Sequence, residues 1–196
     1  REIEERFYIA NLLMRAITND EMSIHYQPIF DINDPQNIVG IEALLRWKNP
    51  LLGEVPPSKF IPLAEQTGYI IYIGEWVLRQ VCQQIQLWER AGYSAFPVAI
   101  NISVKQLEQT GFSKRVIEII REYNIEPAKL ELEITESVSS GDLTTIVKNL
   151  RELKSVGFSI SMDDFGAGFS SLGQIDQFEL DKLKIDKIFV NGLLKF

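Results

Sequence analysis

The sequence predicts an α/β protein, a TIM-like (β/α) barrel that has an antiparallel first strand and is incomplete at its C-terminal end. Three observations support this prediction. Two β-branched runs joined by a turn stand near the start, strand and helix patterns then alternate, and about six strands occur before Phe196. Alternation implies a parallel sheet covered by helices, and this many units favours closure into a barrel. Since a closed barrel of this class has eight strands, we expect the chain to be truncated at both ends.

The first predicted element is an amphipathic helix in residues 1–20. Apolar residues alternate there at spacings of four and three with charges between them: Ile3, Phe7, Ala10, Met14 and Ile17. The stripe is narrow enough for a short coiled-coil seam, but two heptads are few, and a helix packed on its own domain is slightly favoured. We interpret residues 1–20 as a connection to an upstream domain, and residues 21–196 as a single domain truncated before its last strands.

The remaining elements follow in order along the chain. The apolar runs 22–31 and 38–47 flank a turn rich in Asn, Asp and Pro and predict a β-hairpin. Apolar residues at helical spacing then predict helices over 58–68, 75–92, 113–124 and 143–157. Runs rich in β-branched residues predict strands over 96–103, 130–137, 158–166 and 180–190.

Composition narrows the range of functions. Hydrophobic residues make up 45% of the chain, yet no segment approaches the roughly 20 uninterrupted apolar residues of a membrane helix, so we expect a soluble, cytoplasmic protein. The single cysteine, Cys82, can form no internal disulfide, and its place on an apolar helical stripe favours a buried, inert thiol. The net charge of −7 argues against long nucleic acid as a partner, because such binding uses many Lys and Arg contacts to phosphates.

Polar residues follow the predicted strands, where the active site of a β/α barrel forms. At successive strand ends stand Asn101, Glu133, Glu136, Asp163, Asp164, Lys184 and Asp186. Glu42 interrupts an apolar strand, which is a costly place for a charge without a partner. Since the ligand candidates offer oxygen atoms and neither thiol nor imidazole, they predict a site for Mg²⁺ or Mn²⁺ rather than zinc.

Each of these residues taken singly has a structural interpretation. Glu42 could be an interior carboxylate held by Arg46, and Asn101 could cap the next helix. Asp163 and Asp164 are adjacent and would face opposite ways in a regular strand. The glycine-rich segment 163–172 fits a ligand-approaching loop and a plain turn about equally well. The sole histidine lies in the hairpin, and the absence of a GxSxG elbow disfavours a serine hydrolase.

The motif series as a whole resembles the EAL-domain family of cyclic di-GMP phosphodiesterases. From about residue 12 to residue 190 the chain carries, in order, YQPIFD, IEALLRW, GEVPPSKFIPLAEQTG, NIS, ELEITES, DDFGAGFSSL and LKID.

The resemblance implies hydrolysis of one phosphodiester bond of cyclic di-GMP, giving linear pGpG. It implies two divalent cations, Mg²⁺ or Mn²⁺, on Glu42, Asn101, Glu133, Asp163 and Asp164. It further implies that Glu136 steadies the GAGFSSL loop and that Lys184 lies near the attacking water, while Gln27, Arg46 and Asp186 contact the substrate. A sensory or GGDEF-type domain upstream is the expected partner, and a homodimer is left open.

The chain also departs from the family pattern. The loop reads GAGFSSL where GTGYSSL is common, and the family has further strands with a glutamate and a glutamine near the metals. An alternative function is therefore a non-catalytic EAL-like module that binds cyclic di-GMP or a protein partner. The motif residues present are intact, which favours the enzyme. An unrelated metal-dependent barrel enzyme fits the strand-end residues but not the motif series.

Overall fold

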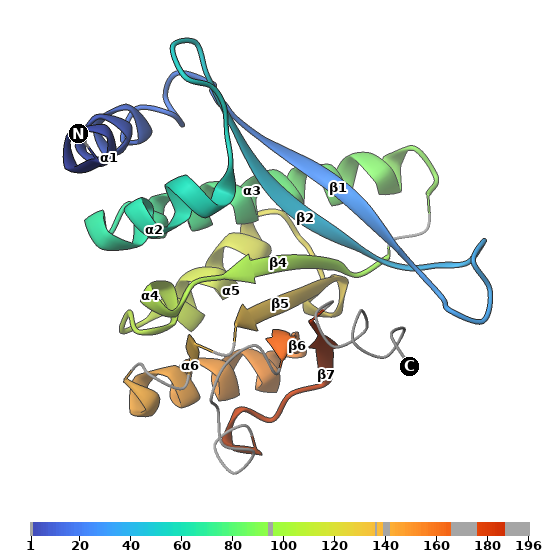
Figure 1. Ribbon diagram of the computed structural model, residues 1–196. Helices are drawn as coiled ribbons and strands as arrows, with labels where there is room; N and C mark the ends of the chain where they lie inside the picture. Colours follow the sequence, from blue (N-terminus) through green and yellow to red (C-terminus); the bar gives the residue numbers. More distant parts are fainter. Residues whose placement is uncertain (1, 94–95, 136, 139–141, 166–175, 187–196) are drawn as a thin grey trace, which may run out of the picture.

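The computed structural model describes residues 2–93, 96–135, 137–138, 142–165 and 176–186. They form one mixed sheet in the order β1-β2-β4-β5-β6-β7, with β3 paired to β2 (Figure 1). The strands are β1 (Met22–Phe30), β2 (Ile38–Asn49), β3 (Gly53–Val55), β4 (Val98–Ile102), β5 (Leu130–Thr135), β6 (Ser159–Phe165) and β7 (Lys182–Ile185). The pairings from β2 through β4, β5 and β6 to β7 are parallel. Among the described residues β7 does not pair with β1, so the barrel is open, as expected.

The antiparallel first strand is confirmed. β1 pairs with β2 in a hairpin that places Gln27 directly opposite Glu42. The turn between the strands is held by the side chains of Asp31 and Asp34, which accept backbone N–H groups two residues further on. Such Asx turns are the reason that Asp and Asn favour these positions.

Helices cover the outer face of the sheet, while the polar strand residues lie on the inner face. The helices are α1 (Glu2–Leu13), α2 (Pro57–Thr67), α3 (Ile70–Arg90), α4 (Val104–Leu107), α5 (Phe112–Glu122) and α6 (Leu143–Val156), with short 3₁₀ turns η1 (Pro127–Lys129) and η3 (Asp176–Phe178). Outward-facing residues of the central strands are buried beneath them, among them Ile100, Leu132 and Met162. Because successive residues of a strand face opposite ways, this packing leaves Asn101, Glu133 and Asp163 on the inner face.

The lead-in helix is present, but the slightly favoured packing of its predicted stripe on the domain is wrong. α1 packs beside α2 through Ile9 and Leu13, and these two residues and Ala16, which follows the helix, are 5% exposed or less. Ile3 and Phe7, from the predicted stripe, are 83% and 71% exposed. Both sets have helical spacing, so the pattern could not tell which one faces the domain.

Other elements differ in detail from their prediction. β3 and α4 were not predicted, and α3 begins at Ile70, ahead of the predicted start. The cap of α4 is Ser103, in a reciprocal capping box with Gln106, so Asn101 does not cap this helix. Cys82 is fully buried as expected, and burial raises the pKa of its thiol to about 12. Within the described ranges, none of the helices has the length and apolar character needed to cross a membrane.

Candidate metal centre

Three carboxylates from three strands converge on the inner face of the sheet. Glu42 comes from β2, Glu133 from β5 and Asp163 from β6, and an oxygen of each lies within 4.8 Å of the others. The strand register brings them together, because β4 is the one strand between β2 and β5, and β6 follows β5 directly. Asn101 lies on this intervening strand β4, in register with Glu133. Its Nδ2 donates a hydrogen bond to Glu42 Oε1 at 3.1 Å.

Lys184 supplies the positive charge among these carboxylates. Its Nζ lies 2.8 Å from Glu133 Oε1, 3.4 Å from Glu42 Oε2 and 3.6 Å from Asp163 Oδ1. The partial burial of this amine acts to lower its pKa, but the contacts to the three carboxylates outweigh burial and raise the pKa. The ammonium group is therefore charged near neutral pH and offsets part of the negative charge of the site.

Glu133 is the most deeply buried of the three carboxylates, with 1% of its surface exposed. Burial raises its pKa to about 7, and the opposing hydrogen bond from Lys184 does not compensate. Its Oε2 is buried and has no hydrogen-bond partner among the described residues. A buried oxygen of this kind is costly unless something binds it, and a cation in the site would do so.

The donor set fits a hard divalent cation. Carboxylate oxygens and the Asn101 carbonyl oxygen are the ligands that Mg²⁺ and Mn²⁺ prefer. The Asn101 amide uses its N–H group toward Glu42, which leaves its oxygen for another contact. The unpartnered Oε2 of Glu133 adds a further ligand atom at the same place.

Asp163 and Asp164 do not alternate as in a regular strand. Asp164 has a φ of 54°, in the left-handed region, and the β6–β7 register shifts between Met162 and Phe165. Asp163 lies in the cluster, whereas Asp164 is an exposed residue near Asp186. Withdrawal of the Asp164 carboxyl group from water and the charges of Asp163 and Asp186 raise its pKa. The structure thus groups Asp164 with Asp186, beside the three-carboxylate cluster.

The other predicted site residues occupy the same side of the sheet. Gln27 is exposed and opposite Glu42, and Arg46 lies two inward positions further along β2. The Arg46 guanidinium donates to the Leu45 carbonyl at 2.9 Å and lines a cavity of about 330 Å³ that also contacts Asn101. Glu42 is paired with Asn101 and Lys184, so the interpretation that Arg46 holds it is wrong. Glu136 and the loop 166–172 fall outside the described residues.

Sequence reasoning missed a second layer of polar residues beneath the cluster. Glu131 and Lys182 form an ion pair at 2.5 Å, one inward position before Glu133 and Lys184 on the same strands. Ser161, fully buried and in register with Glu133, has an Oγ without a hydrogen-bond partner in the described part of the chain. The period-two spacing of 131 with 133 and of 182 with 184 was the available signal.

The chain is similar in sequence to a known protein family and to several known proteins. A sequence model of the EAL domain family matches residues 10–195. The chain is 42% identical over 191 residues to an uncharacterized signaling protein of Caulobacter vibrioides, covering 97% of this chain and 23% of that protein. It is 38% identical over 191 residues to the bifunctional diguanylate cyclase/cyclic di-GMP phosphodiesterase MucR of Pseudomonas aeruginosa, covering 97% of this chain and 28% of MucR. The chain therefore spans about a quarter of these curated relatives.

Solved structures agree with the sequence matches. The PaMucR phosphodiesterase in complex with c-di-GMP superimposes with a TM-score of 0.87 at 38% identity, over 96% of this chain and 76% of that chain.

Proposed function

This chain belongs to the EAL domain family, and from that premise we propose that it hydrolyses one phosphodiester bond of cyclic di-GMP to give linear pGpG. The observation that carries the proposal is the convergence of Glu42, Glu133 and Asp163 around the amine of Lys184. The names of MucR and of the PaMucR complex support the choice of substrate.

Two divalent cations, Mg²⁺ or Mn²⁺, would be held by Glu42, Asn101, Glu133 and Asp163, with Asp164 at the edge of the cluster. When bound, they supply the Lewis acidity that makes water nucleophilic near neutral pH and neutralises charge on the phosphoryl oxygens. The protein side chains mainly hold the cations and the substrate in position. Lys184, charged and in contact with all three carboxylates, orients them, and by resemblance to the family it would lie near the attacking water.

We assign substrate binding to the side of the site that β2 forms. Arg46 follows Glu42 by two inward positions, so its guanidinium can reach a phosphate beside the carboxylates and form paired hydrogen bonds. Gln27 lies opposite Glu42, and Asp186 lies near Asp164. Each therefore provides a polar group beside the carboxylate cluster. By resemblance to the family, Glu136 supports the loop that follows β6.

Residues 21–196 would form the catalytic domain and residues 1–20 the helix that couples it to a regulatory domain. The packing of α1 on α2 through Ile9 and Leu13 supports a fixed attachment of this helix. The name of MucR joins diguanylate cyclase and phosphodiesterase in one protein, which supports a GGDEF-type domain as the partner.

The deciding experiment incubates the chain with cyclic di-GMP and MgCl₂ or MnCl₂ and separates the nucleotides by chromatography. We expect linear pGpG, and we expect Glu42→Ala to lower the rate by more than about 100-fold while circular dichroism shows an intact fold, since it removes a ligand. Glu126→Ala, an exposed glutamate before β5, is the matched control and should retain full activity. Binding of cyclic di-GMP without turnover would replace the enzyme by the binding module, and full activity of Glu42→Ala would refute the metal assignment.

A further inference from the structure

Ser161 of β6 is a buried polar residue beside the metal centre that has no part in the function proposed above. It is 0% exposed, and its Oγ has no hydrogen-bond partner among the described residues. The strand register places it directly beside Glu133 of β5 and, on its other side, beside Lys182 of β7. Buried hydroxyl groups are nearly always paired in folded proteins, so this one calls for an acceptor on the inner face of the sheet.

The neighbour on β7 does not provide that acceptor. An ammonium group only donates hydrogen bonds, and the Nζ of Lys182 donates to Glu131 Oε2, across the intervening strand β6. Glu131 itself is in register with Ser159, one inward position away from Ser161. The acceptor directly beside Ser161 is therefore the carboxylate of Glu133, whose Oε2 is likewise buried and without a partner in the part of the chain that the structure describes.

The Glu133 carboxylate is held at one of its two oxygens. Lys184 Nζ donates to Oε1 at 2.8 Å. The terminal torsion of a glutamate side chain has a broad energy minimum, so one donor does not fix the plane of the carboxylate. A second donor at Oε2 would fix it. A carboxylate oxygen can accept this hydrogen bond and bind a cation at the same time, because it has two lone pairs.

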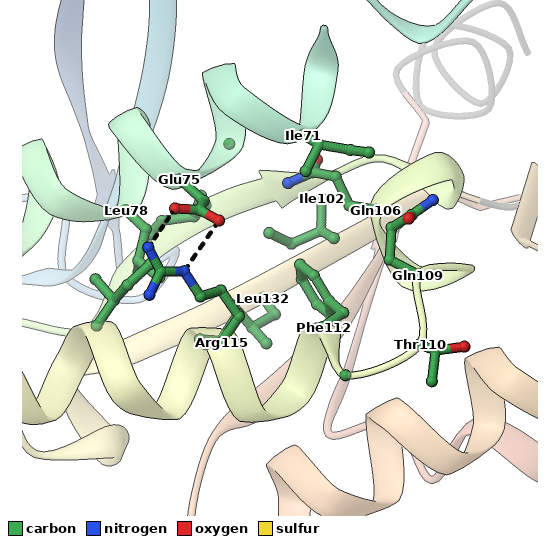
Figure 2. Close-up of a pocket in the computed structure, with 15 residues that line it drawn as sticks. Ile71, Glu75, Leu78, Ile102, Gln106, Gln109, Thr110, Phe112, Arg115 and Leu132 are labelled. Atoms are coloured by element: carbon green, nitrogen blue, oxygen red, sulfur yellow. Dashed lines mark hydrogen bonds and ion pairs between the residues drawn. The ribbon is translucent and has the colours of Figure 1, made fainter. Parts of the chain in front are cut away.

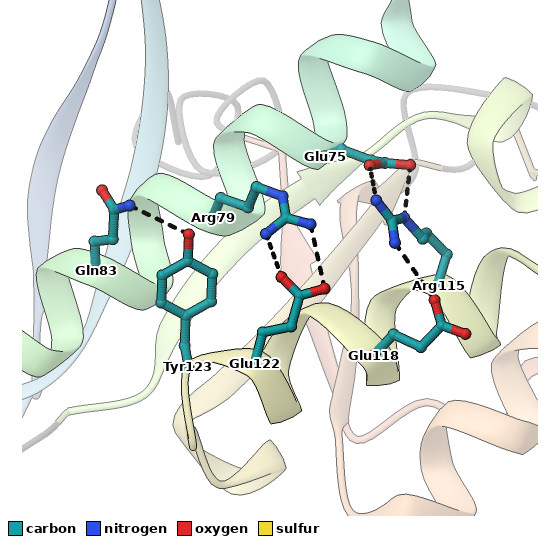
Figure 3. Close-up of polar contacts among 7 residues, drawn as sticks. All are labelled: Glu75, Arg79, Gln83, Arg115, Glu118, Glu122 and Tyr123. Carbon is teal, nitrogen blue, oxygen red and sulfur yellow. Dashed lines mark hydrogen bonds and ion pairs between the residues drawn. The ribbon is translucent and has the colours of Figure 1, made fainter.

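The backbone that carries Glu133 is anchored from the outer face of the sheet. Leu132, its outward-facing neighbour, is 1% exposed and lines the space between α3 and α5 (Figure 2). A row of polar contacts joins these two helices, among them the ion pair between Glu75 and Arg115 at 2.8 Å (Figure 3). What remains to be fixed at Glu133 is therefore the orientation of its side chain.

We propose that Ser161 is a positioning residue of the metal centre: its hydroxyl donates a hydrogen bond to Glu133 Oε2 and, together with Lys184, holds the carboxylate in the orientation that binds a divalent cation. This inference rests on the metal site of the proposed function. The two atoms are not hydrogen-bonded to each other in the structure, so the contact forms when the cation binds. Partners of this kind typically change metal affinity by about 10- to 100-fold.

Calorimetric titration of the full chain with MnCl₂ measures this effect directly, without turnover. We expect Ser161→Ala to weaken Mn²⁺ binding by about tenfold or more. Ser159→Ala is the matched control, because it removes a hydroxyl from the same strand and the same face, two residues before Ser161. The Ser159 hydroxyl contacts Asp181 rather than the carboxylate cluster, so this variant should keep the affinity of the wild type.

Thermal unfolding in EDTA separates a positioning role from a structural one. Without the cation the Ser161 hydroxyl has no partner to lose, so Ser161→Ala should keep its Tm or raise it by roughly 1 to 4 °C, whereas Ser159→Ala should lower it. Equal Mn²⁺ affinities in Ser161→Ala and wild type would overturn the role of Ser161, as would weaker binding together with a lower Tm in EDTA. If the wild type bound no Mn²⁺, the metal centre itself would be refuted, and this inference with it.

Discussion

At the scale of single residues, Glu133 has the most constrained environment in the site. It is held by Lys184 on one oxygen, and the other oxygen is buried without a partner among the described residues. Burial raises its pKa to about 7 in spite of the nearby amine. The metal-free protein therefore carries a carboxyl group that ionises near the pH at which the site would operate, and a bound cation would favour the ionised form.

This environment predicts how stability depends on pH when divalent ions are chelated. Below the ordinary pKa of 4.5, Glu133 is protonated in both the folded and the unfolded chain. As pH rises toward 7 the unfolded chain loses this proton first, so the free energy of unfolding falls, and the full loss is reached above pH 7. The difference between 4.5 and about 7 corresponds to about 3 kcal/mol.

Urea unfolding in EDTA at pH 5 and pH 8 measures most of this loss. We expect Glu133→Gln to remove most of it, because the amide does not titrate, and Glu126→Gln to keep it. A decline of the same size in Glu133→Gln and in wild type would contradict the assignment to Glu133.

Arg46 gives a prediction about substrate affinity. Replacing Arg46 with Ala removes a guanidinium that can pair with a phosphate, so KM should rise by about tenfold or more with a smaller change in kcat. Arg46→Lys should recover part of the affinity, because it keeps the charge but loses the paired geometry. Steady-state kinetics with cyclic di-GMP measure both values, and an unchanged KM in Arg46→Ala would rule out the phosphate contact.

At the scale of helices and strands, periodicity predicted most elements because each buries one face. The hairpin, the four long helices after it and the strands at 98–102, 130–135 and 159–165 occupy their predicted segments. Periodicity failed where two faces were apolar, as in α1, and where an element was too short to have a period, as in α4 and β3. Ser103 caps α4 in a reciprocal pair with Gln106, whose side chain accepts the Ser103 backbone N–H. This pair can be predicted from the sequence only after the start of the helix is known.

The side chain of Asn149 in α6 links this helix to the segments around α4 and α5. The helical pattern of the sequence could not predict this role. Its side chain donates to the carbonyls of Leu107 and Gln109 at 2.7 and 3.0 Å and accepts from Ser113 Oγ at 3.0 Å. Asn149→Ala removes all three hydrogen bonds, although Ser113 Oγ keeps Glu152 as a partner, so we expect a loss of about 2 to 4 kcal/mol in the free energy of unfolding. Urea denaturation tests this, with Asn11→Ala on the exposed face of α1 as a control that should change stability by less than about 0.5 kcal/mol. Equal losses of stability in Asn149→Ala and Asn11→Ala would show that the hydrogen bonds of Asn149 do not stabilise the fold.

At the scale of the whole molecule, the site is assembled from segments far apart in the chain. Glu42 and Lys184 are separated by 142 positions, yet their side chains are 3.4 Å apart. Barrel topology alone predicted this convergence, because strand ends share one rim. It could not predict the left-handed backbone at Asp164, since that depends on the local register shift between β6 and β7.

Because the proposed ligands lie on β2, β4, β5 and β6, a cation bound to them should stabilise the whole sheet. A ligand that binds the folded chain alone adds about 2.7 kcal/mol at 100 times its Kd, which for a chain of this size raises the Tm by roughly 5 to 10 °C. We expect MgCl₂ or MnCl₂ to produce this shift in thermal unfolding, and EDTA to reverse it. Glu42→Ala should lose the shift and Glu126→Ala should keep it, since Glu126 lies before β5 at the other end of the strand. If the two variants responded alike to the metal, the stabilising site would lie elsewhere on the chain.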